Sequence, residues 1–332
     1  MTRRKLLIVL GAAALAVPLA ALAQPAAKQA RVGYLSDLPA FLHAPGAPRA
    51  SLLREFRDGL HEHGYVAGEN LAIEYRYAEG KVERLAELAA ELVALKVDVV
   101  VPAGTASLRA ARSATANIPI VALDLQIDPV ADGFVASLGR PAGNVTGLFL
   151  DQPDMAGKWL ELLKDAIPKI SRAAVLWDST TPPHQLKAVE SAAKSLGVAL
   201  QTLTVTVPGD FEHAFAAAGK ARAQAVVILS SPMIASQGPH IAILAAAERI
   251  PTVSAFSELA TAGCLMAYGP NLAGLYRRLG AIAGKVLNGA RPGGLPVERP
   301  SRFDLVINLQ TARALGITIP QSVLMRAHSL IE

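Results

Sequence analysis

Polar residues, with a few glycine and aromatic neighbours, follow a series of short apolar runs in this 332-residue sequence. The runs are rich in Val and Ile and bounded by Pro and Gly, which is typical of parallel strands covered on both faces. Because ligands of open α/β sheets collect at the carboxyl ends of the strands, the residues after the runs are candidates for binding a small polar solute. In the first half of the chain these candidates are Ser36, Asp37, Gly104, Thr105, Asp124, Gln126 and Asp128. In the second half they are Asp178, Ser179, Ser230, Ser231, Phe256, Glu258 and Tyr268.

Thr105 is the strongest single candidate. It ends a small-residue turn between a predicted strand at 97–101 and a helix that runs to about residue 116. The start of a helix offers unpaired backbone N–H groups and the positive end of the helix dipole, so this turn favours an anionic or strongly polar ligand group. Asp124 or Asp128, after the next predicted strand, could pair with an ammonium group of the same ligand.

Polarity at the strand ends has a second explanation, because loops are polar whether or not they bind anything. The collective pattern is more informative than any one residue. Two facing rims of hydroxyls, carboxylates and helix starts form a cleft that can close on a small polar solute. Trp177, at the end of another run, fits either an apolar wall of that cleft or the core.

Motifs of catalysis are absent from the sequence. It contains no G-x-S-x-G, no H-E-x-x-H and neither of the common glycine-rich phosphate-binding patterns. The compact cluster His61-Glu62-His63 resembles a metal site, but residues two apart on a helix point to different sides, which favours a solvated helix end. We therefore expect no catalytic residues, no metal site and no cofactor. Cys264 is the only cysteine, so an internal disulfide is excluded.

The first 23 residues have the pattern of a cleaved signal peptide. A positive start is followed by an apolar run and by Ala21-Leu22-Ala23, a small-residue cleavage site. The alternative, a transmembrane anchor, needs a longer apolar run. Sec and twin-arginine export both fit the basic start. We expect a periplasmic protein, cleaved after Ala23.

Charge argues against nucleic acid as a partner. The formal net charge of +5 falls to +2 without the signal, because three basic residues and no acidic ones are removed. Aromatic residues make up 5% of the chain, and the basic residues are scattered. A nucleic-acid-binding surface needs a cluster of basic residues.

The elements that must position these candidates form two successive β-α-β-α series, from Val32 to Gly147 and from Ala173 to Tyr268. Two series predict an α/β protein with two doubly wound, Rossmann-like lobes and a ligand cleft between them. A closed eight-fold barrel is the alternative, although it needs one uninterrupted series. A long helix at 271–288 and a strand at 303–308 return the chain to the first lobe and then to the second. The predicted boundaries are 24–147 plus 270–297 for the first lobe and 148–269 plus 298–332 for the second.

The sequence contains the blocks LAAELVALKVDVVVPAGT at 88–105, DPVADGFVASLGRPAGNVTG at 128–147 and FDLVINLQTARALGITIP at 303–320. These and further blocks, which together cover nearly all of the mature chain, resemble ABC-transporter substrate-binding proteins of the tryptophan/tyrosine-uptake type, within the periplasmic binding protein type I fold. The resemblance implies three crossovers between the lobes, a small-molecule ligand, and delivery to a membrane permease driven by an ATPase. We expect a monomer.

The sequence departs from the family pattern at two places on the rim of the second lobe. Ser230-Ser231-Pro232 stands where the family has an Asp-Pro step, and 254–257 lacks an Arg-Glu-Phe stretch. The resemblance therefore does not imply an aromatic amino acid as the ligand. The expected function is a non-enzymatic, exported receptor for a small organic solute, amino-acid-like or a small carboxylate. The alternatives are a ligand sensor for a membrane receptor and an exported hydrolase on the same fold.

Overall fold

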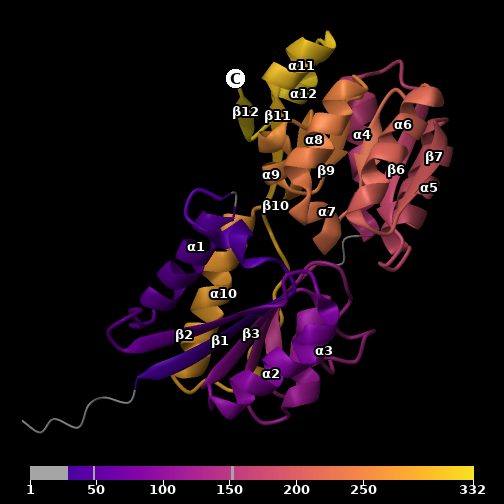
Figure 1. Cartoon of the computed structure of the whole chain (residues 1–332). Helices are drawn as coiled ribbons and strands as arrows, with labels where there is room; N and C mark the ends of the chain where they lie inside the picture. Colours follow the sequence, from indigo (N-terminus) through magenta and orange to yellow (C-terminus); the bar gives the residue numbers. More distant parts are fainter. Residues whose placement is uncertain (1–28, 48, 151–152) are drawn as a thin grey trace, which may run out of the picture.

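A computed structural model describes residues 29–47, 49–150 and 153–332. The predicted signal peptide at 1–23 lies outside these residues. The described chain forms two α/β lobes, each with its own sheet, connected by extended segments (Figure 1). The predicted fold class, two doubly wound lobes, is confirmed.

The sheet of the first lobe has five parallel strands in the order β2-β1-β3-β4-β5. All residues of its last three strands are buried, as their apolar sequences predict. Strand order reverses between β1 and β3, so the carboxyl ends of these neighbours flank the point where ligands bind in doubly wound folds. The strands are β1 (Ala30–Ser36), β2 (Leu71–Tyr77), β3 (Val99–Ala103), β4 (Ile120–Asp124) and β5 (Val145–Phe149).

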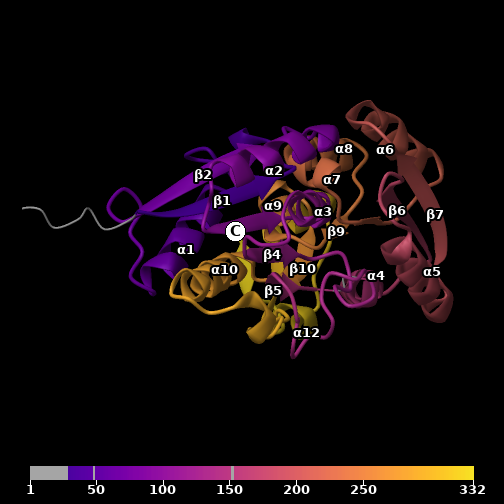
Figure 2. The same cartoon turned by 90° about the horizontal axis from the view of Figure 1, so that it is seen from below.

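Helices cover both faces of this sheet. Figure 2 shows α1 (Ala50–His61) and α10 (Leu272–Leu287) side by side on one face, with α2 (Leu85–Ala94) on the other. The remaining helix of this lobe, α3 (Thr105–Ala114), packs with α2 in the same apolar core. Glycine permits the close approach of α1 and α10, because a Cβ at Gly59 would overlap the backbone of α10. Short 3-10 turns are η2 (Ala40–His43), η3 (Val82–Arg84) and η5 (Pro292–Gly294).

The second sheet has seven strands in the order β12-β11-β10-β9-β8-β6-β7. All neighbouring pairs are parallel except β10 and β11. The strands are β6 (Arg172–Asp178), β7 (Ala199–Val205), β8 (Val226–Ile228), β9 (Thr252–Ser254), β10 (Met266–Pro270), β11 (Phe303–Asn308) and β12 (Ser329–Ile331).

Two apolar cores lie on the two faces of the second sheet. One core contains residues of α4 (Pro153–Ala166), α5 (His184–Leu196), α11 (Leu309–Leu315) and α12 (Gln321–Leu324). The other contains residues of α6 (Phe211–Lys220), α7 (Pro232–Ser236), α8 (Gly238–Ala247) and α9 (Ser257–Ala262). A 3-10 turn, η4 (Pro208–Asp210), precedes α6.

The chain passes between the sheets three times: after β5, between β10 and α10, and between η5 and β11. Before the last passage, Glu298 forms an isolated parallel β-bridge with Leu148 of β5. The predicted residue boundaries of the lobes stay a prediction. Among the described residues, no helix is both long and apolar enough to span a membrane.

Candidate functional site

The carboxyl ends of β1, β3 and β4 bring three of the candidates together in the first lobe. Asp37 follows β1, Gly104 follows β3, and Asp124 ends β4. A Cβ added at Gly104 would lie 3.4 Å from a carboxylate oxygen of Asp37, so the carboxylate faces the turn before α3. Gly104 has a φ of 101°, which L side chains rarely adopt, so glycine suits this turn.

Asp124 is fully buried, and one of its carboxylate oxygens has no hydrogen-bond partner among the described residues. Its Oδ1 accepts a hydrogen bond of 2.8 Å from the backbone N–H of Gln126. Within the described chain, neither Asp124 Oδ2 nor the Thr105 hydroxyl has a hydrogen-bond partner. Burial raises the pKa of Asp124 to about 6. The Thr105 hydroxyl is near the carboxylate and offsets part of that rise, but the two groups do not have the geometry of a hydrogen bond. Unpaired buried polar atoms are costly, and a polar ligand group would remove that cost.

Asp37 is the second buried carboxylic acid of this rim. Burial raises its pKa to about 6, and two backbone N–H groups and the positive charge of Arg49 offset part of the rise. At neutral pH both acids are mostly ionised. The two acids lie at the carboxyl ends of strands that are separated by β3, so each buried carboxylate by itself is suited to a ligand's ammonium group.

Three other first-lobe candidates have structural partners. Ser36 accepts a hydrogen bond from the backbone N–H of Leu38 through its hydroxyl oxygen. Asp128 is half-buried, and its Oδ1 accepts from the N–H groups of Val130 and Ala131, which holds the turn after β4. Gln126 is half-buried beside Asp124 and contributes its N–H to it.

Most second-lobe candidates are engaged by their own chain. Asp178 Oδ1 accepts from both the N–H and the hydroxyl of Thr180, at 2.9 and 2.6 Å. Ser231 Oγ accepts from the Ile234 N–H at 3.1 Å and so caps α7. Ser179 is exposed and hydrogen-bonds next to the end of β7.

Ser230 differs from these neighbours. Its backbone is fixed by the side-chain amide of Gln185, which accepts from Ser230 N at 2.9 Å and donates to Ser230 O at 3.2 Å. The Ser230 hydroxyl and the Trp177 indole N–H are among the buried side-chain atoms that have no hydrogen-bond partner in the described residues. Ser230 also lines a cavity of about 10 Å³, just large enough for one water, with Ser231, Ser254 and Phe256 among its other lining residues.

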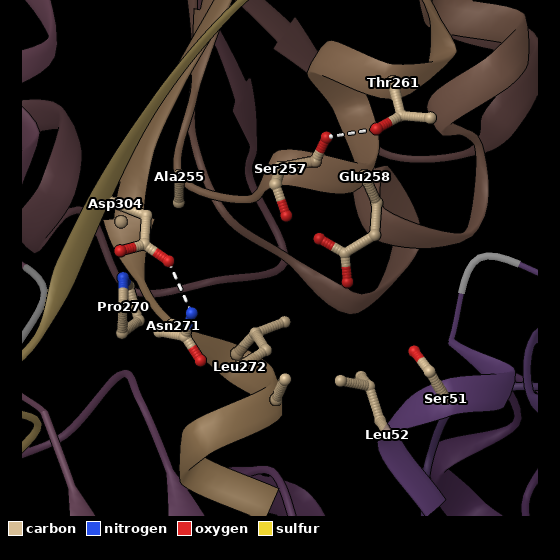
Figure 3. A pocket seen from close by; sticks show the side chains of 12 residues that line it. Ser51, Leu52, Ala255, Ser257, Glu258, Thr261, Pro270, Asn271, Leu272 and Asp304 are labelled. Atoms are coloured by element: carbon tan, nitrogen blue, oxygen red, sulfur yellow. Dashed lines mark hydrogen bonds between the residues drawn. The ribbon is translucent and has the colours of Figure 1, made fainter. Parts of the chain in front are cut away.

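A larger cavity of about 230 Å³ lies between the lobes beside the second crossover. Figure 3 shows the predicted residue Glu258 reaching from α9 into this cavity, toward the start of α1. On the opposite wall, Asn271 donates to Asp304. Tyr268 lies on β10 close by, where its carbonyl accepts a hydrogen bond from Trp159.

Arg49, which the sequence interpretation missed, touches both lobes. It ends the long loop after β1, and its side chain contacts Glu258 and the ring of Phe256. The unusual length of that loop was the only signal in the sequence. In the same loop, His43 is stacked on Tyr77, and burial lowers its pKa to about 4. Ser107, another buried hydroxyl without a partner among the described residues, was missed because its position inside a helix carries no signal.

No group of three or more His, Cys, Asp and Glu residues in the described part of the chain is arranged to hold a metal ion. Glu62 of the His-Glu-His cluster pairs instead with Arg277 on α10, at 2.7 Å.

Comparison with known proteins places the chain in a family. The family model "ABC transporter substrate binding protein" matches residues 45–331. The tyrosine-binding protein of Clostridioides difficile is 27% identical over 269 residues, which is 79% of this chain and 75% of the relative.

Two solved structures are similar over 91% of this chain and 100% of their own chains. A conserved domain protein from Vibrio cholerae has 27% identity and a TM-score of 0.81. An ABC domain in complex with L-Trp from Streptococcus pneumonia has 26% identity and a TM-score of 0.80. These likenesses confirm the predicted function, a solute-binding protein of an ABC transporter, over the sensor and hydrolase alternatives. The chain belongs to the ABC transporter substrate-binding proteins.

Proposed function

We propose that this protein binds an amino-acid-like solute between its lobes, with the ligand's ammonium group at Asp37 and Asp124. The observation that carries the proposal is the pair of buried acids with a free acceptor, Asp124 Oδ2, beside the unpartnered hydroxyl of Thr105. Buried charges are stable only when they are paired, and a cationic group would give the Asp124 carboxylate a partner of opposite charge.

The start of α3 supplies the complementary half of the site. The Gly104 N–H donates to the carbonyl of Leu123. The N–H groups of the first turn of α3, a ten-residue helix that begins at Thr105, and the positive end of its dipole favour a carboxylate. A zwitterion therefore matches the first lobe at both of its charged ends.

The second lobe contributes a hydroxyl and aromatic surface. Ser230 offers its free hydroxyl, and Trp177 and Phe256 are half-buried. Relatives that bind tyrosine and L-Trp are consistent with an aromatic side chain on the ligand. The departures at Ser230-Ser231 and 254–257 leave smaller amino acids as a second group of candidates.

The same proposal includes the transporter partners and the cellular location of the protein. It acts as a periplasmic monomer, cleaved after Ala23, and delivers its solute without chemical change to an ABC permease driven by an ATPase. Residues 24–147 plus 270–297 and 148–269 plus 298–332 act as the two closing bodies. The candidate ligand residues without structural partners, above all Thr105 and Ser230, lie on opposite bodies.

Thermal unfolding of residues 24–332 against L-tyrosine, L-tryptophan, other amino acids, small carboxylates, sugars and nucleosides tests the proposal. A ligand at about 100 times its Kd stabilises by about 2.7 kcal/mol, which gives a clear shift of Tm. We expect the largest shift from an amino acid and recovery of that compound unchanged. Turnover of the compound, or shifts from sugars or nucleosides alone, would contradict the proposal.

A further inference from the structure

Arg49 makes two contacts from the first lobe to the second. Its Nε lies 3.8 Å from Glu258 Oε1 at the start of α9. Its guanidinium carbon lies 5.9 Å from the centre of the Phe256 ring, within the range of a cation–π contact. The side chains of Arg49 and Glu258 are 12% and 17% exposed, so solvent screens their attraction less than it screens a surface pair.

The backbone around Arg49 is held in place. The Arg49 N–H donates to the carbonyl of Leu42, and the Arg49 carbonyl accepts from the N–H of Leu52 in the first turn of α1. The side chain therefore projects from a fixed point of the first lobe. Its charge acts on Asp37 as well, since it lowers the pKa of that ligand-facing acid.

Glu258 and Phe256 are the second-lobe residues that Arg49 contacts. Among the described residues, Glu258 forms its ion pair with Arg49, and its Oε2 is buried without a hydrogen-bond partner. Phe256 packs against the core of each lobe. Both contacts of Arg49 join the two lobes, so a motion that separates the lobes at this point would break them. They would then give a free-energy difference between open and closed arrangements, as a population shift requires.

We infer that Arg49 is a positioning residue that holds the two lobes together through Glu258 and Phe256 and thereby sets how readily the cleft closes. Its effect on affinity rests on the proposed function, whereas its effect on the lobes does not require a ligand. Arg49 therefore links closure to the rim that carries Asp37 and Asp124.

The distance between the lobes in the ligand-free protein measures this role directly. Spin labels at Val82→Cys and Val207→Cys report on the first and second lobes, because both valines are 54% exposed. The native Cys264 is fully buried and stays unlabelled. Pulsed electron paramagnetic resonance then compares Arg49→Gln, Glu258→Gln and the double variant with the parent.

A matched control is available inside the first lobe. Arg277 pairs with Glu62 at 2.7 Å, and both residues belong to the α1–α10 face rather than to the interface between lobes. Arg277→Gln removes ion pairs of the same chemistry, to Glu62 and to Glu55, and should leave the distance between lobes unchanged.

We expect Arg49→Gln and Glu258→Gln each to move the distribution toward longer distances, and the double variant to move it no further than Arg49→Gln alone. Arg49→Lys, which keeps the charge, should restore part of the short-distance population. Distributions identical to the parent, or an equal shift in Arg277→Gln, would overturn the inference.

A second readout uses L-tyrosine as the probe in isothermal titration. Arg49→Gln should raise its Kd by about threefold to tenfold, because the substitution removes an ion pair and a cation–π interaction that stabilise the closed state. If the parent binds L-tyrosine and Arg49→Gln binds it with the same Kd, the link between Arg49 and binding is wrong. A parent that binds no L-tyrosine would count against the proposed ligand, while the distance measurement would still decide the role of Arg49.

Discussion

The two rims of the cleft are alike in sequence and different in structure. Each has an aspartate as the last residue of a mostly buried strand, Asp124 in β4 and Asp178 in β6. In both, Oδ1 accepts a hydrogen bond from the backbone N–H two residues on, and Asp178 Oδ1 also accepts one from the Thr180 hydroxyl. The difference is that Asp124 Oδ2 is buried without a hydrogen-bond partner among the described residues. The raised pKa of Asp124 reflects burial that its local partners do not offset.

This difference predicts separate roles for the two lobes in ligand binding. The first lobe presents charge, from two buried acids and a helix start, and the second presents a hydroxyl and aromatic surface. A ligand-binding role follows from the hydrogen bonds that a side chain has left over, because a group that caps its own turn has little to offer a ligand.

The largest expected effect comes from neutralising the charged rim. Asp124→Asn should raise the Kd of an amino-acid ligand by about 100-fold, since it removes a buried charge that faces an ammonium group. Isothermal titration measures the change. The matched variant Asp178→Asn should change the Kd by no more than about threefold and instead lower the stability of the second lobe; the reverse ranking would break the comparison.

The charged rim also predicts a pH dependence of binding. Both acids have a pKa of about 6, so each is mostly ionised at pH 7 and mostly protonated at pH 5. Affinity for an ammonium ligand should therefore fall by about tenfold or more from pH 7 to pH 5. Titrations across this range should show a shallower profile for Asp124→Asn than for the parent. An affinity that does not change with pH would show that these acids do not bind the ligand's ammonium group.

The same acids act in the opposite direction on the ligand-free fold. Their folded-state pKa lies above the unfolded value of 3.8, so the folded state binds protons more tightly. Their stabilising contribution is greatest at low pH and is lost as pH rises through about 4 to 6, by about 3 kcal/mol for each acid. Urea unfolding without ligand at pH 5 and pH 7 should show Asp124→Asn gaining stability relative to the parent as pH rises. A constant difference would contradict this assignment.

The smallest expected effects lie on the second rim. Ser230→Ala should raise the Kd by about threefold to tenfold, the value of one neutral hydrogen bond. Ser231→Ala removes the cap of α7 and should lower stability by about 1 kcal/mol with little change in Kd. Equal effects of the two variants on Kd would show that the Ser230 hydroxyl does not form a hydrogen bond of its own to the ligand.

Much of the fold was accessible from the sequence because apolar periodicity is local. The predicted strand at 303–308 matches β11 residue for residue. Short elements such as β12 were not predicted, since three residues at an edge carry no clear pattern. The site was less accessible, because Asp124 and Asp178 differ only in partners that folding supplies. Arg49 was missed because its contacts with Phe256 and Glu258 join residues about two hundred positions apart in sequence.

The central claim is that the first lobe recognises an ammonium group. Isothermal titration of the parent protein with L-tyrosine and with 3-(4-hydroxyphenyl)propanoate, which lacks only the amine, tests it most directly. We predict that L-tyrosine binds at least about 100-fold more tightly, because the analogue leaves Asp37 and Asp124 unpaired. Equal affinity for the two compounds, or tighter binding of the analogue, would contradict the account.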